Sequence, residues 1–135
     1  MGTLKDRRAW RRFEEALATS GEAIVMAPSS IADRLRELRG QPVHVAASRD
    51  FESQFGSDWR GASEMADSVN HALAYDRDKA LDEILTLLST WTGTKAELLQ
   101  AGAAILERFA SSEGDYGERV LAATLAAFVD IVEGG

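Results

Sequence analysis

The amino-acid sequence predicts a mainly α fold, an antiparallel helical bundle of about five to six helices. Apolar residues recur at helical spacing along most of the chain. Capping patterns mark the starts of several segments, and connections of about two to six residues place consecutive helices antiparallel. The 135 residues, 45% apolar and 27% charged, are expected to form one domain over 1–135.

The first helix is predicted at about 4–19. Thr3 and Asp6 resemble a capping box at its start, and Ser20 with Gly21 ends it. One face of this helix is apolar and is expected to pack on the core. That face consists of Trp10, Phe13 and Leu17.

Residues 22–47 are the ambiguous part of the chain. The apolar run 23–27 and the alternating run 43–45 both favour short strands, and a helix ending near Gly40 lies between them. This order admits a short two-stranded, βαβ-like element with parallel strands. An α+β fold is therefore the alternative, with 1–47 as a mixed α/β-like N-terminal part.

From residue 62 onward the pattern is helical and predicts a helical bundle over 62–132. Asp76 is expected to cap a new helix, and Thr94 with Glu97 forms a capping box. Alanines in the last segment allow close approach of a neighbour, which predicts that the last helix is central. The expected helices lie at about 62–75, 77–92, 95–110 and 116–132.

The chain is acidic, and its charge is unevenly distributed. The formal net charge at pH 7 is -7. Residues 1–39 hold eight basic and six acidic side chains, whereas 40–135 hold seven basic and sixteen acidic ones. The acidic part repels nucleic acid and anionic lipid, so only the first helix is expected to attract them.

Several classes of chemistry are excluded by the sequence. The absence of cysteine excludes disulfides, thiolate metal sites and cysteine nucleophiles. No nucleophile elbow, P-loop or dinucleotide fingerprint occurs, so we expect neither a cofactor nor a metal. The sequence lacks a signal-peptide pattern and a membrane-length apolar run, which predicts a cytoplasmic protein without membrane partners. Twelve arginines against three lysines suggest a GC-rich, bacterial genome.

The two histidines are the remaining acid–base candidates. His44 lies in an apolar run, whereas Asp67 precedes His71 by four residues and shares its helix face. One helix offers too few ligands for zinc, so an exposed pair is the expectation. A His71 buried beside Asp67 in a pocket would instead indicate a small-ligand-binding domain or an enzyme.

The leading functional hypothesis is a non-enzymatic helical protein-interaction module. Its acidity suits the covering of a basic partner surface, as in an immunity- or antitoxin-like inhibitor or an assembly subunit. A homo-oligomer is also compatible with the sequence. Aromatic anchors and clustered carboxylates are the expected contacts. These candidate partner-binding residues are Phe51, Phe55, Trp59, Asp76, Asp78 and Asp82.

The alternative is a nucleic-acid-associated small subunit that uses the first helix. Positive charge in the opening turns of a helix opposes the helix dipole, so these arginines must find anions elsewhere. The anions are phosphates, an acidic partner or the domain's own carboxylates. The candidate anion-binding residues are Arg7, Arg8, Arg11 and Arg12.

Overall fold

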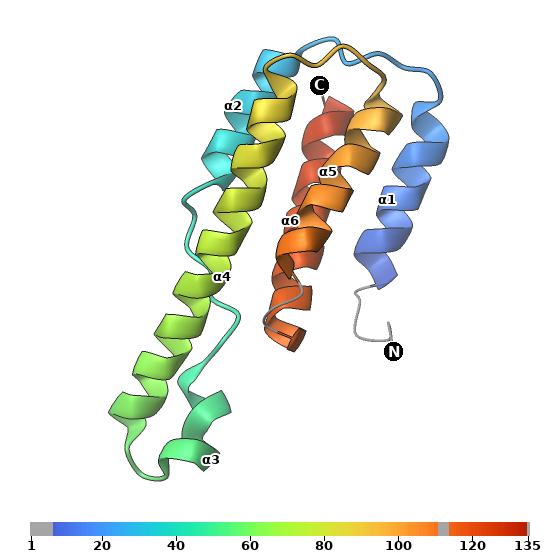
Figure 1. Cartoon of the computed structure of the whole chain (residues 1–135). Coiled ribbons are helices and arrows are strands. Elements are labelled where there is room, and N and C mark those ends of the chain that lie inside the picture. The colour runs from blue at the N-terminus through green and yellow to red at the C-terminus, as the bar shows by residue number, and fades with distance from the viewer. Residues whose placement is uncertain (1–6, 111–113, 135) are drawn as a thin grey trace.

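The computed structural model describes residues 7–110 and 114–134 and shows a helical bundle (Figure 1). Neighbouring long helices along the chain run in opposite directions, and two short helical turns precede the longest helix. The predicted mainly α, antiparallel bundle is therefore confirmed. The elements are α1 (Arg7–Ser20), α2 (Pro28–Leu38), η2 (Ser48–Phe51), α3 (Glu52–Phe55), α4 (Trp59–Leu88), α5 (Lys95–Ala110) and α6 (Gly114–Gly134).

The last helix is the central one, as its alanines predicted. α6 contacts α1, α2, α4 and α5. Residues 120–129 carry no charged side chain, a composition typical of a buried helix. Leu125, Phe128 and Val132 are completely buried in the core. The apolar faces of the other helices therefore converge on α6.

The predicted apolar face of the first helix lies against this core. Phe13 is buried, and Trp10 and Leu17 are half-buried against the same cluster. The Trp10 and Phe13 rings meet edge to face with centroids 5.7 Å apart. The capping box expected at Thr3 and Asp6 lies outside the described residues.

The prediction of two helices separated at Asp76 was wrong, because α4 is one helix of 30 residues. No glycine or proline interrupts residues 62–92, so nothing in the backbone breaks the helix. Asp76 lies in the helix interior and is half-buried. The carboxylate that caps α4 belongs to Asp58, whose side chain accepts a hydrogen bond from the Gly61 N–H at 3.2 Å.

The prediction of a possible parallel strand pair within 22–47 was also wrong, since the described residues form no β-strand there. The run around Ile24 instead makes one antiparallel bridge to Thr94. Residues 41–47 lie along α4, where side chains satisfy their backbone. Two strands alone are marginally stable, which explains why the helix surface is the better partner for this segment.

The structure of α2 explains the rest of this region. α2 begins with Pro28 at its first turn, where proline's missing N–H costs nothing. It ends before Gly40, near the position that the sequence predicted, and the φ of 88° at Gly40 is in the left-handed region that favours glycine after a helix. None of the helices in the described ranges combines the length and apolarity needed to cross a membrane.

A close contact between α5 and α6 in the core depends on Gly102. A Cβ atom built at Gly102 would collide with the ring of Phe128, which is completely buried. Glycine at this position therefore lets α5 and α6 approach each other over the phenyl ring.

We predict that Gly102→Ala destabilises the protein by about 1–3 kcal/mol, because overpacking outweighs the gain of about 1 kcal/mol in helix propensity. Chemical denaturation measures the change. In a Phe128→Leu background the same substitution should be neutral or stabilising, and an equal loss in both backgrounds would contradict the proposed collision.

The capping box at the start of α5 is confirmed. Glu97 Oε1 accepts from the Thr94 N–H at 3.0 Å, and the Glu97 N–H donates to Thr94 Oγ1 at 3.1 Å. The backbone hydrogen bond from Thr94, assisted by the Thr94 hydroxyl, holds the pKa of Glu97 below its usual value.

We predict that Glu97→Gln lowers the free energy of unfolding at pH 7 and that this deficit shrinks in acid. A carboxylate with a lowered pKa contributes stability above its unfolded-state pKa and loses it as pH falls through the folded-state value. Urea titrations from pH 7 down to about pH 3 measure the difference in the free energy of unfolding between the wild type and Glu97→Gln. Glu14→Gln, an exposed change in α1, is the matched control and should show no comparable convergence.

Candidate functional site

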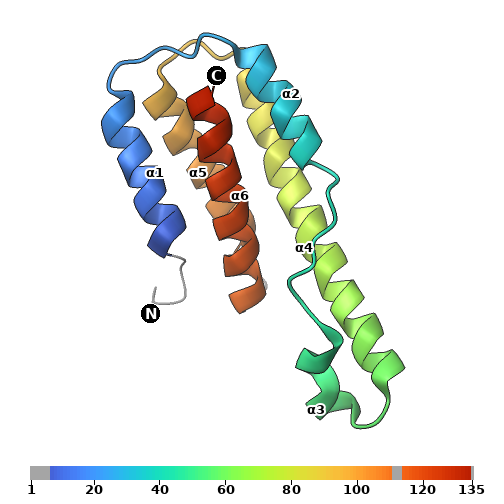
Figure 2. The ribbon, with the colours of Figure 1, turned by 180° about the vertical axis from the view of Figure 1, so that it is seen from behind.

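The N-terminal half of α4 extends beyond the rest of the bundle, together with η2 and α3 (Figures 1 and 2). We call residues 48–72 the arm. Within the arm, α4 contacts η2 and α3. Ala62 and Ala66 of α4 are both buried. Small residues here let the short turns lie close to α4.

The three aromatic residues predicted as partner anchors all belong to the arm, but they have different surroundings. Phe51 is half-buried, and its ring centroid lies 6.3 Å from that of Tyr116 in α6. Phe55 is half-buried and lies against Gly61 in the first turn of α4. Trp59 is 72% exposed. Among the three, only Trp59 presents most of its side chain to solvent.

A hydrogen bond between Asp50 and Tyr116 links the arm to α6. Asp50 Oδ2 accepts from the Tyr116 hydroxyl at 2.8 Å and from the Ala47 N–H at 3.0 Å. The Ala47 N–H and then the tyrosine hydroxyl lower the pKa of Asp50, while the pKa of Tyr116 is raised by the same bond. Sequence reasoning missed this pair, because the two residues are 66 positions apart and follow no motif.

Side chains of α4 hold the preceding segment in place. Asn70 Oδ1 accepts from the N–H groups of Val45 and Ala46 at 3.1 and 2.9 Å, and Asn70 Nδ2 donates to the Ala46 carbonyl at 2.9 Å. Arg77, which is buried, donates to the Gln41 carbonyl at 2.5 Å. Side chains of a single helix, α4, thus satisfy backbone hydrogen-bonding groups of this extended segment, which has no strand partner.

The three acidic candidates on α4 do not form one open surface. Asp78 accepts from Arg77 Nη2 at 2.9 Å and from the Gly40 N–H at 3.3 Å. Asp82 binds the Arg39 guanidinium through both of its oxygens. Asp76 is half-buried on another side of α4. Asp78 and Asp82 therefore serve internal contacts.

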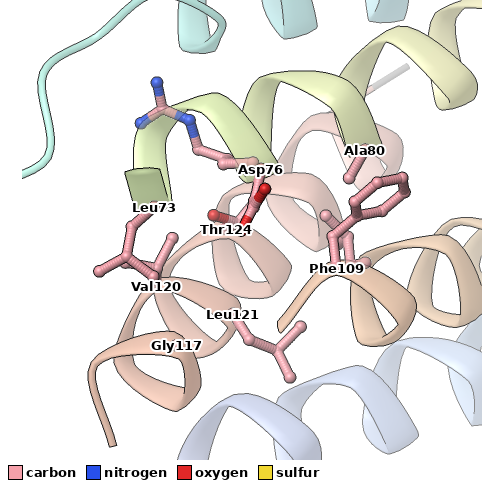
Figure 3. A pocket seen from close by; sticks show the side chains of 10 residues that line it. Leu73, Asp76, Ala80, Phe109, Gly117, Val120, Leu121 and Thr124 are labelled. Carbon is pink, nitrogen blue, oxygen red and sulfur yellow. The ribbon is translucent and has the colours of Figure 1, made fainter. Parts of the chain in front are cut away.

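Asp76 lines a small cavity between α4, α5 and α6 (Figure 3). The figure shows its carboxylate beside Thr124, with Leu73, Val120 and Leu121 among the apolar residues around them. The cavity volume is about 20 Å³, enough for roughly one water molecule. A cavity of this size has no room for a substrate.

The predicted anion-binding arginines occupy different environments. Arg12 pairs with Asp130 at 2.5 Å and Glu133 at 2.8 Å, both in α6, and these carboxylates raise its pKa, Asp130 most strongly. Arg8 lines a hollow between α1 and α6 together with Arg12, and Arg11 is exposed. For Arg12, the domain's own carboxylates are thus the anion. Arg7 is the first residue of α1, and its side chain lies outside the described part of the chain.

Both histidines are exposed and line one shallow hollow with Asp67 and Asn70. His71 Nδ1 lies 3.0 Å from the Asp67 carbonyl oxygen, a contact within one helix turn. Among the described residues, no group of three or more His, Asp or Glu side chains is arranged to hold a metal ion. The His71 imidazole is exposed and contacts only the preceding turn of its own helix in this interaction, so it lacks the burial that is typical of a catalytic pocket.

No family model, curated protein or solved structure matches this chain. Functional inference therefore rests on the surfaces of the molecule itself. Two of them differ from an ordinary solvated helix face: the tip of the arm and the side of α6 that lies between α1 and α2.

We predict that Asn70→Ala releases residues 41–47 and destabilises the protein by about 1–3 kcal/mol, because three backbone groups lose their partner. Hydrogen exchange followed by NMR should show the Val45 and Ala46 amides exchanging at least about tenfold faster. Ser68→Ala, an exposed change on the same helix, is the control. Unchanged protection of both amides in Asn70→Ala would show that Asn70 does not hold this segment in place.

Proposed function

We propose that this protein is a non-enzymatic helical module that binds another protein and that Trp59 is the anchor of the contact. The observation that carries the proposal is the exposure of Trp59, at 72%, at the tip of the arm. Tryptophan is among the residues most enriched at the energetic centres of protein interfaces. Leaving it in water forgoes about 2 kcal/mol or more of burial free energy.

The position of Trp59 on α4 strengthens this interpretation. Trp59 lies on the same helix face as Ala62, Ala66, Leu73 and Arg77, which are all buried. The buried face of α4 therefore continues for one more turn to Trp59, where the side chain is exposed. A partner that packs against this turn would extend the existing buried face.

The charges around Trp59 favour a basic partner surface. Apart from Asp50, which binds Tyr116, four exposed acidic residues of the arm outnumber its two exposed arginines, Arg49 and Arg60. Such an arrangement steers a basic protein and repels nucleic acid. The acidic contact proposed from the sequence thus belongs to the arm rather than to Asp78 and Asp82. These carboxylates are Glu52, Asp58, Glu64 and Asp67.

The test begins with a photo-crosslinking amino acid at position 59 and, as a control, at Tyr75, which is 61% exposed on another side of α4. Crosslinking is done in the cells from which the gene comes. We expect position 59 to give an adduct with a defined protein that position 75 does not give. An adduct with nucleic acid alone would contradict the proposal.

With that partner purified, Trp59→Ala should weaken binding about 30-fold, the cost of losing a hot-spot side chain. Isothermal titration calorimetry measures the affinity, and rising salt should weaken it further. Tyr75→Ala should change it less than about threefold. Equal affinities of the wild type and Trp59→Ala, with an unchanged melting temperature, would rule out Trp59 as the anchor.

A further inference from the structure

A continuous trough runs along one side of α6. Three hollows, of about 340, 270 and 230 Å³, are each lined by residues of α6. They adjoin one another, because Ala123 lines the first and third, and Leu38 and Gln41 line the second and third. Figure 2 shows α6 between α1 on one side and α2 on the other. α1 forms one wall, and α2 with residues 41–45 forms the other.

The floor of the trough does not have the composition of a solvated surface. Along a helix that faces water, charged and polar side chains occupy the outer face. On α6 the positions between Arg119 and Asp130 that are not fully buried are Ala123, which is exposed, and Val120, Ala126 and Ala127, which are half-buried. The sequence of α6 is thus that of a helix covered on all sides, whereas the bundle leaves one side uncovered.

The trough is also positively charged in an acidic protein. Five arginines and two carboxylates line the three hollows, whereas the whole chain has 15 basic and 22 acidic residues. Two of these arginines, Arg12 and Arg77, already pair with carboxylates of the protein itself. The positive charge is greatest beside α1, where Arg8, Arg12 and Arg119 line one hollow without a carboxylate. Arg12 forms the ion pairs with α6 described above, and Arg119 is exposed.

We propose that this trough binds one amphipathic helix of another protein, with small or medium apolar side chains on its inserted face and carboxylates along its flank. A helix seated on α6 would cover the alanine floor, as in other helix-in-groove complexes. Its carboxylates would lie opposite Arg119 and Arg8. The alanines leave room above the floor for leucine or methionine side chains.

A second copy of this chain is a poor occupant. Its own α6 is recessed between the same two walls, so the floors of two copies do not meet. The other strong candidate, nucleic acid, is disfavoured by the apolar floor and by the net charge of -7. The trough and Trp59 are distinct surfaces, so the two proposals can be tested separately.

The experiment uses the full chain and a displayed library of helical peptides of about 18 residues, long enough to span most of α6. One face of every peptide carries alanine and leucine, and the flanking positions vary between glutamate and lysine. Selected peptides are resynthesised, and their affinities are measured by fluorescence anisotropy. We expect glutamate to be selected on one flank.

Two substitutions identify the site. Ala123→Phe fills the trough and should weaken binding about tenfold or more, whereas Ala104→Phe, at an exposed alanine of α5, should not. Arg119→Glu should weaken binding similarly, and Arg60→Glu on the arm is its control. Trp59→Ala should leave peptide binding unchanged, which separates this test from that of the arm.

Four results would overturn the proposal. They are a selection that yields no binding peptide, a selection that prefers lysine, binding that survives both Ala123→Phe and Arg119→Glu, and a wild-type dimer in sedimentation equilibrium that Ala123→Phe converts to monomer. The last result would identify a second copy as the occupant.

Discussion

The apolar character of α6 is the constraint on which the rest of the structure depends. A run of ten residues without charge, 120–129, is largely removed from water by α1, α2, α4 and α5, which pack on it from different sides and leave Ala123 exposed. Phe128 occupies the centre, and Gly102 provides the space for its ring. The other helices need to be amphipathic only, because α6 supplies the surface against which each buries its apolar face.

A second feature, the ladder of polar side chains on α4, orders the long connection that follows α2. Arg39 binds Asp82, the Gly40 N–H binds Asp78, the Gln41 carbonyl binds Arg77, and the backbone near residue 46 binds Asn70. Each contact lies further toward the N-terminus of α4 than the one before it. The connection therefore runs antiparallel to the helix, and side chains replace the hydrogen bonds that a neighbouring strand would supply.

This ladder changes the meaning of the acidic cluster on α4. Paired carboxylates at a protein surface contribute little stability individually, about 0–1 kcal/mol each. Here they also neutralise Arg39 and Arg77, and a buried arginine requires such a partner. On the arm, exposed carboxylates outnumber the two arginines, whereas three arginines line the trough beside α1. The two proposed contact surfaces thus carry charges of opposite sign.

The sequence by itself determined the helical class, the ends of α5 and the central place of the last helix. These follow from local signals: the Thr94–Glu97 capping box, the apolar period of 3.6 residues and the alanine content of α6. It did not distinguish Trp59 from Phe51 and Phe55, and only the structure shows that Trp59 is the most exposed of the three. Local signals were misleading where a residue type has two uses, as with Asp76, which resembles a cap yet lies inside a continuous helix.

Only the tertiary structure decided which polar groups meet. The strand-like runs around Ile24 and Val45 have the pattern of strands, but their backbone partners, Thr94 and Asn70, lie far away in the sequence. The pairing of Arg12 with Asp130 and the contact of Asp50 with Tyr116 likewise join distant segments. The trough, too, could not be predicted from the sequence. Periodicity identifies an apolar face, but the packing of all the helices together determines whether that face is covered.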